Sequence, residues 1–238
     1  VPVHGFGIVA IIFAVGVFIF LTLANADERT GLPSKHDLAD TVKSWGIKHQ
    51  RGFYTLGTIA ALDSSTRSGF LTFVAFLMIE KGVATELAAT AVLATVFGGM
   101  CGKYAVGLIA ERIGVARTII LTEIATAGLI ILVILLPSVA AFFLLPLLGV
   151  FLNGTSSAIY GSVADLIEGE KHSRAYALIY TLGSACGLVA PLLYGLLADS
   201  SSVTTALVFV AIVVLLTVPL CGTLATALSE AKGNALGI

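Results

Sequence analysis

The stretch VTTALVFVAIVVLLTVPLCGTL, residues 203–224, decides the fold class of this chain. It contains no charged residue, and its length matches the about 20 apolar residues that cross the hydrocarbon core of a bilayer as an α-helix. A membrane β-strand needs only about ten residues of alternating character, whereas this run is longer and does not alternate. Because backbone polar groups in lipid must pair within the segment, the run is predicted to be a transmembrane helix.

Similar apolar stretches precede it along the chain. They give the predicted helices 5–24, 52–79, 85–110, 115–136, 139–167 and 175–198. Of the 238 residues, 58% are apolar and 11% are charged, against about 45–50% and about 25% in soluble domains. A soluble chain of this length cannot bury that much apolar surface. The predicted fold class is an all-α, multi-spanning membrane protein with seven transmembrane helices.

Polar residues divide the chain into a first helix (1–24), a loop (25–51), a six-helix bundle (52–226) and a short tail (227–238). In the loop, Leu38, Val42 and Trp45 fall on one helical face. That pattern fits either an amphipathic helix on the membrane surface or a solvated linker. The chain opens on Val1 without a basic signal-peptide region, so we expect it to begin partway through a longer protein.

Lys and Arg residues set the predicted orientation. Those on one side of the predicted bundle are Arg29, Lys35, Lys43, Lys48, Arg51, Lys103, Arg112, Arg117, Lys171, Arg174 and Lys232. The other side has only Lys81, beside Glu80 and Glu86. Cytoplasmic loops collect positive charge. We therefore expect a protein of the cell (inner) membrane with its amino end outside and its carboxyl end in the cytoplasm.

Several function classes are excluded by what the sequence lacks. The net charge is −1 and no basic stripe carries interleaved aromatics, so no nucleic-acid partner is expected. The three cysteines lie in apolar stretches at unrelated spacings, and the histidines form no ligand pattern, so neither a metal nor another cofactor is expected. The segment GGMCGK, residues 98–103, lacks the spacing and strand of a phosphate loop and is better explained by helix packing. No nucleophile–base arrangement appears, so the chain is not predicted to be an enzyme.

The strongest local motif is GLIAERIGVAR, residues 107–117, which joins two predicted helices on the basic side. Gly107 is expected to let two helices approach closely, and Gly114 to permit a tight turn. Glu111 and Arg112 are expected at the membrane surface, where their charges stay hydrated. The motif resembles the loop signature of the major facilitator superfamily, Gly-x-Leu-Ala-Asp-Arg-x-Gly-Arg-Lys, with Glu111 in place of the acidic Asp.

The weakened basic positions of this motif fit the copy that follows the eighth helix of that family. With this placement the seven helices resemble family helices six to twelve, and six of them form a half bundle. The loop 25–51 then resembles the central cytoplasmic loop, GSACGLVAPLLYG (183–195) the eleventh helix, and 165–174 the charged turn after the tenth. The resemblance implies secondary transport by rocking of two bundles about a central site. The expected partners are the lipid bilayer, an amino-terminal half bundle or another chain that completes the cavity, and a small-molecule substrate.

The resemblance also implies a cytoplasmic charge cluster that makes and breaks as the bundles rock. The residues assigned to this gate are Gly107, Glu111, Arg112, Gly114, Arg117, Asp165, Glu170 and Arg174. Simple anchoring of the topology by positive charge remains the alternative.

Charges inside the predicted membrane segments mark the candidate substrate or proton-coupling site. Asp63 and Arg67 lie near the middle of one predicted helix, where each charge costs roughly 2.5–3.5 kcal/mol on insertion scales. Four residues apart, they share one helix face and form either a coupling pair or a structural ion pair. Glu123 either is buried, where it could carry a proton, or reaches the membrane interface.

Polar and aromatic residues on the later helices extend this candidate site. Asn153, Ser157 and Tyr160 share one helix face, and Tyr176 and Tyr180 share another. They either line a cavity for a small amphipathic ligand or hydrogen-bond between helices. The predicted function is part of a proton-coupled secondary transporter, an antiporter of small organic solutes. The alternative is a facilitator-like subunit or assembly factor that does not itself transport.

Overall fold

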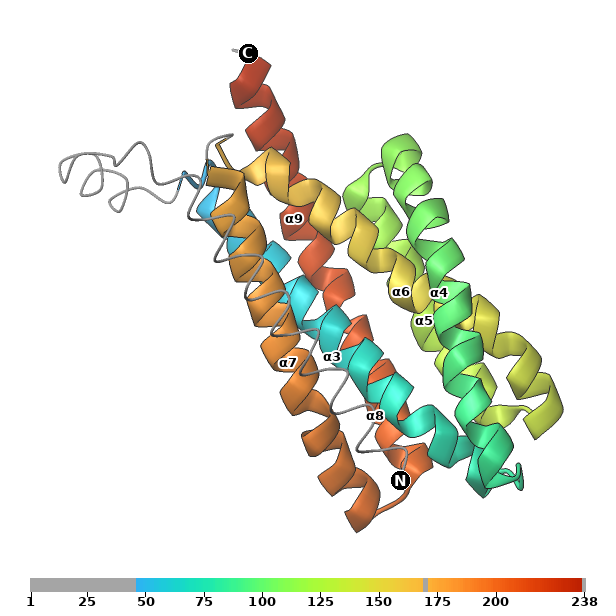
Figure 1. The fold of residues 1–238 in the computed structure, drawn as a ribbon. Coiled ribbons are helices and arrows are strands. Elements are labelled where there is room, and N and C mark those ends of the chain that lie inside the picture. The colour runs from blue at the N-terminus through green and yellow to red at the C-terminus, as the bar shows by residue number, and fades with distance from the viewer. Residues whose placement is uncertain (1–45, 169–170, 237–238) are drawn as a thin grey trace, which may run out of the picture. The chain divides into compact units, whose positions relative to one another are not determined.

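The computed structural model describes residues 46–168 and 171–236, and side chains up to residue 231. This part of the chain is a helical bundle (Figure 1). Its helices are α3 (Gln50–Glu80), α4 (Thr85–Ile113), α5 (Val115–Leu135), α6 (Ser138–Leu166), α7 (His172–Ser200), α8 (Val203–Leu215) and α9 (Thr217–Leu236). The predicted helix 5–24 and most of the predicted loop 25–51 lie outside the described residues.

Five segments of the described chain are long and apolar enough to cross a membrane. They are α4, α5, α6, α7 and the continuous stretch Val203–Ala231 that contains α8 and most of α9. The 31 residues of α3 would extend about 46 Å at 1.5 Å per residue. Because α3 carries Asp63 and Arg67 near its middle, it is less apolar than these five. The structure thus supports a multi-spanning all-α protein, whereas seven spans stay a prediction.

The last predicted helix differs from expectation in two ways. Instead of one helix over 203–224, α8 ends at Leu215 and α9 begins at Thr217. Pro219 explains the break, because it has no N–H and its ring clashes with the carbonyl group four residues earlier. The segment 227–238, predicted to be a short tail, is helical over most of its length, since α9 continues to Leu236.

The two ends of the bundle are tied by different side chains. At one end the ammonium group of Lys81 donates to the carbonyl oxygens of Ile134 and Leu136, at 2.7 and 2.6 Å. At the other end Nδ1 of His49 accepts a hydrogen bond from the Gly52 N–H, and its Nε2 lies 2.8 Å from Oε2 of Glu230. These contacts hold the turn after α3 to the end of α5, and the start of α3 to α9.

Glycines bring α4 and α6 into direct backbone contact, side by side in Figure 1. A Cβ atom added to Gly98 or Gly102 of α4 would overlap the backbone of Pro146 or Val150 of α6. The glycines of 98–103 therefore serve helix packing, as predicted. The expectation for Gly107 is wrong: an added Cβ there would meet only Ser157, at an ordinary 3.9 Å. The close approach lies one to three turns earlier in α4.

Candidate functional site

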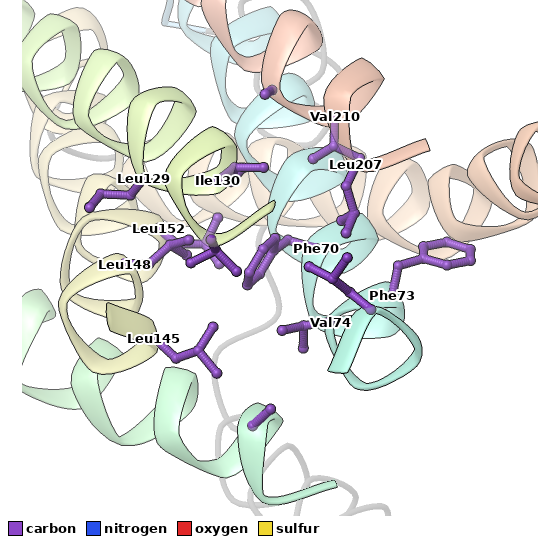
Figure 2. Close-up of a cluster of buried hydrophobic side chains, with 14 of the residues drawn as sticks. Phe70, Phe73, Val74, Leu129, Ile130, Leu145, Leu148, Leu152, Leu207 and Val210 are labelled. Atoms are coloured by element: carbon purple, nitrogen blue, oxygen red, sulfur yellow. The ribbon is translucent and has the colours of Figure 1, made fainter. Parts of the chain in front are cut away.

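The apolar core of the bundle consists of two clusters. The first lies toward the Lys81 end, where Phe70, Val74, Ile130, Leu148 and Val210 converge from α3, α5, α6 and α8 (Figure 2). The second lies toward the His49 end and is formed by α3, α5, α6, α7 and α9; Leu56, Ile119, Ile159 and Leu224 are among its members. Along α3, α5 and α6, and from α8 to α9, buried polar residues separate the two apolar clusters.

Buried polar residues occupy the segments between the two apolar clusters, and we call them the polar layer. Its members are Asp63 and Thr66 of α3, Thr122, Glu123 and Thr126 of α5, Thr155 and Ser156 of α6, and Thr217 of α9. On α3, for example, Asp63 and Thr66 lie between Ala60 of the second cluster and Phe70 of the first. The break between α8 and α9 falls at the same level. Polarity is thus concentrated midway along the bundle, where a membrane is most apolar.

Asp63 and Arg67 form an ion pair in this layer. Oδ2 of Asp63 lies 3.6 Å from Nη2 of Arg67, and the same nitrogen lies 3.4 Å from the hydroxyl oxygen of Ser64. The two side chains are within reach of one another, as their spacing predicts. Asp63 is 4% exposed, so its carboxylate faces the bundle interior rather than the surroundings.

Glu123 is buried, with 1% of its surface exposed. Of the two possibilities that the sequence leaves open, the structure therefore excludes a Glu123 side chain that reaches the membrane interface. Its carboxylate interacts electrostatically with both Asp63 and Arg67, although it lies on another helix. The polar layer thus holds two carboxylates and one guanidinium group.

Three buried side-chain oxygens in the described chain have no hydrogen-bond partner: Oγ1 of Thr66, Oε1 of Glu123 and Oγ1 of Thr126. All three belong to the polar layer. They come from two acid–x–x–Thr segments, Asp63 to Thr66 and Glu123 to Thr126, and residues three apart share one helix face. Other threonines of the layer, such as Thr122 and Thr155, bond to carbonyl groups of their own helices. Both segments share the acid–x–x–Thr spacing, which could have identified them in the sequence.

The charge of this group determines what it can do chemically. An ionised carboxylate that is buried without a partner is costly, and one guanidinium group balances only one carboxylate. A proton, or another unit of positive charge, balances the second. The polar layer can therefore take up and release a positive charge.

A cavity of about 720 Å³ opens beside the polar layer, between α4, α6 and α7. We call it the tyrosine groove; it is lined by Lys103, Ser156, Ser157, Tyr160, Tyr176, Ala177 and Tyr180. The rings of Tyr160 and Tyr180 have centroids 6.1 Å apart. Tyr160 also interacts electrostatically with Arg67 and Asp63, which connects the groove to the polar layer.

The lining of the groove differs at two positions from the residues that the sequence analysis groups together. Asn153 does not line it: the Asn153 amide donates to the Gly149 carbonyl oxygen at 3.4 Å, and its side chain packs against Gly99. Lys103 does line it, although its charge suggested a place near the basic loop. The sequence could have indicated this position, because Lys103 lies about two helical turns before the Glu111–Arg112 pair at the end of α4. Ser157, Tyr160 and Tyr180 line the groove, and their role in substrate binding stays a prediction.

The residues assigned to the cytoplasmic gate are only partly gathered. Gly114, Arg117 and Asp165 line a cavity of about 280 Å³ with residues of α9. Gly114 has a φ of +90° and joins α4 to α5, so the predicted tight turn is confirmed. The other assigned residues, Gly107, Glu111, Arg112 and Arg174, do not line this cavity, and Glu170 lies outside the described residues.

The helices, the buried polar layer and the groove together define a multi-pass membrane protein with a polar interior. Residues 56–234 match the family model of the Major Facilitator Superfamily. The chain belongs to this family, which implies secondary transport across a lipid bilayer and not enzymatic catalysis. No curated protein matches the chain.

Proposed function

We propose that this chain forms one wall of a proton-coupled, alternating-access transporter of small organic solutes. In this proposal residues 52–226 are the carboxyl-terminal half bundle, and residues 1–24 correspond to family helix six. The observation that carries the coupling is Glu123: it is buried midway along the bundle, has an unpartnered oxygen, and interacts with the Asp63–Arg67 pair.

The exposed faces of α4 and α7 support a half bundle that needs a complementary partner. Only 28% of an apolar 18-residue stretch of α4 and 22% of one of α7 is buried, compared with 50% for α5. Large apolar side chains are exposed on both helices, including Phe97 and Met100 of α4 and Leu188 and Leu192 of α7. An amino-terminal half bundle, in the same or another chain, would cover these faces and close the tyrosine groove.

The proposed coupling step is an exchange of partners at Arg67. When Glu123 is ionised, it competes with Asp63 for the guanidinium group. When Glu123 carries a proton, this competition ends and Arg67 pairs with Asp63 alone. Because Arg67 also interacts with Tyr160, protonation at Glu123 changes the charge distribution behind the wall of the groove. Each bundle state would then prefer one protonation state, which is the requirement for coupling.

The gate residues are proposed to act at the basic end of the bundle. Arg117, just after the turn at Gly114, lines one cavity with Asp165 and residues of α9, so tilting of the bundle would change their surroundings. The positive-inside rule supports a cytoplasmic location for this end. The exposed Glu86 and the carbonyl-bound Lys81 would then lie at the outer end.

The test uses the complete gene product in proteoliposomes containing a pH-sensitive dye. A panel of small organic acids, amines and neutral solutes is added, and proton movement is recorded together with exchange of labelled solute. The variant Glu123→Gln should lose solute-driven proton movement while exchange continues. Glu86→Gln, which changes an exposed carboxylate, is the matched control and should behave as the unmodified protein.

Two results would contradict the proposal. Undiminished proton movement in Glu123→Gln would remove Glu123 from coupling. Absence of any solute or proton movement in the unmodified protein would favour the alternative of a non-transporting subunit or assembly factor.

A further inference from the structure

We propose that the tyrosine groove binds an organic anion with a flat, apolar or aromatic body. This inference rests on the proposed transport function and adds the chemical class of the substrate. The observations are the charge of Lys103, the three tyrosines, and the burial of the nearby acids. None of them alone specifies a ligand, but together they describe a site with a cationic group and aromatic walls.

Lys103 gives the groove an unbalanced positive charge. Within the described chain it forms no ion pair, and no acidic residue lines the groove. The nearest acids that interact with the wall belong to the polar layer, where Asp63 is 4% exposed and Glu123 is 1% exposed. Their carboxylates are therefore not presented to a ligand. A cleft lined by charge of one sign and apolar walls focuses the field and attracts ligands of the opposite charge.

Arg67 lies behind the same wall, in the polar layer. It interacts electrostatically with Tyr160 and forms an ion pair with Asp63 at 3.6 Å, so the layer adds no net negative charge when Glu123 carries a proton. A ligand carboxylate in the groove would be attracted to the ammonium group of Lys103. The hydroxyl groups of Ser157 and Tyr160 can then donate hydrogen bonds to its oxygens.

The shape and lining of the groove fit the apolar part of such a ligand. Tyr160 and Tyr180 form a tilted pair at an interplanar angle of 37°, with Tyr176 on the same side as Tyr180, and the small side chain of Ala177 leaves the wall open. Aromatic faces favour offset or edge-on stacking with another ring. The volume of about 720 Å³ lies within the range of roughly 300–1,000 Å³ that is usual for small-molecule sites.

An organic cation is the competing ligand class, since tyrosine faces also attract cations. In this groove such a ligand would meet the like charge of Lys103 without an exposed carboxylate to offset it. The sign of the ligand charge therefore decides between the two classes. A pair of ligands with the same ring and chain but opposite charge separates them directly.

The experiment measures equilibrium binding of radiolabelled 3-phenylpropionate and of 3-phenylpropylamine to the purified complete gene product in detergent. The acid should bind at least about tenfold more tightly than the amine. Lys103→Gln should abolish this preference, and Lys103→Arg should retain most of it. Arg51→Gln removes an exposed cation outside the groove and should leave the preference unchanged. Tyr180→Leu should weaken binding of the acid without reversing the preference.

Equal or tighter binding of the amine would overturn the inference, as would a Lys103→Gln variant that keeps the preference for the acid. Failure of both ligands to bind to folded, monodisperse protein would also overturn it. Transport in the proteoliposome assay is scored separately. Binding of the acid without any transport would refute the proposed function, and transport of amines alone would refute only the anion site.

Discussion

Arg67 lies one helical turn after Asp63, and its Nη2 is 3.6 Å from Oδ2 of that residue, close to the midpoint of α3. Asp63 is almost completely buried, whereas the Arg67 side chain is 22% exposed. The pair is thus asymmetric: the anion is held inside the bundle and the cation is partly exposed. Loss of Arg67 and loss of Asp63 should therefore affect the stability of the protein differently.

Arg67→Gln should destabilise the protein more than the double variant Asp63→Asn/Arg67→Gln. The single change leaves a buried carboxylate without its cation, and breaking a fully buried pair costs about 3–5 kcal/mol. Partial exposure of Arg67 should reduce that cost. The measurement is the midpoint of thermal unfolding in detergent, with Arg51→Gln as a control for loss of an exposed positive charge. A double variant that is less stable than Arg67→Gln would show that the pair stabilises the fold by more than charge compensation.

Removing the unpartnered hydroxyl group of Thr126 should affect stability and function in opposite directions. Thr126→Val keeps the side-chain shape and removes a hydroxyl that has no partner, so the protein should be equally stable or more stable by up to about 1 kcal/mol. If the hydroxyl serves the coupling site, solute-driven proton movement should fall at the same time. Thr122→Val is the matched control, because its hydroxyl bonds to the Thr118 carbonyl oxygen at 3.0 Å; it should lose about 1 kcal/mol. Unchanged coupling in Thr126→Val would leave that hydroxyl without a functional role.

Much of the fold could be predicted because apolar length is a strong signal. The predicted helix 115–136 and the observed α5, Val115–Leu135, differ by one residue. The break between α8 and α9 was missed although Pro219 was visible, because prolines are tolerated inside membrane helices. Indeed, Pro146 and Pro191 lie within unbroken α6 and α7. The presence of proline alone therefore does not decide between a continuous helix and a break.

The candidate site was predictable within one helix and less so between helices. Their spacing along the sequence placed Asp63 and Arg67 together, since residues four apart lie on the same face of a helix. No local rule relates Glu123 on α5 to that pair, or Lys103 on α4 to the tyrosines of α6 and α7. Those relations depend on helix rotation and packing, which the glycine contacts between α4 and α6 help to set.

Gly98→Ala should disrupt the packing of α4 against α6. The added Cβ would overlap the carbonyl oxygen of Pro146, and a backbone atom cannot move aside as a flexible side chain can. Gly128→Ala is the control, because a Cβ there meets nothing within 4 Å. It should be neutral or stabilising by up to about 1 kcal/mol, the gain from replacing glycine within a helix. The fraction of monodisperse protein after heating, measured by size-exclusion chromatography, distinguishes the two variants. Equal recovery of both would mean that α4 and α6 are not in backbone contact.

At the basic end, Arg117→Ala should alter the conformational balance of the transporter more than Arg112→Ala. Arg117 lines the small cavity with Asp165 and α9, whereas Arg112 in the last turn of α4 does not line it. The reporter is the labelling rate of Ser229→Cys, a residue of the same cavity, by a membrane-impermeant maleimide. Cys101, Cys186 and Cys221 are replaced by Ala in this background. We expect the rate to change about threefold or more in Arg117→Ala, since a charge interaction near the protein surface contributes up to roughly 1 kcal/mol to a two-state equilibrium.

Arg112→Ala tests the family-based assignment of that residue to the gate. If Arg112 only anchors the topology, its loss should leave the labelling rate and expression close to those of the unmodified protein. If it belongs to the gate, the labelling rate should change while expression is spared, because an exposed arginine contributes little to folding. A larger effect for Arg112 than for Arg117 would mean that the gating contact forms with residues outside the Asp165 cavity. The comparison thus separates a charge that stabilises one bundle state from a charge that sets orientation in the membrane.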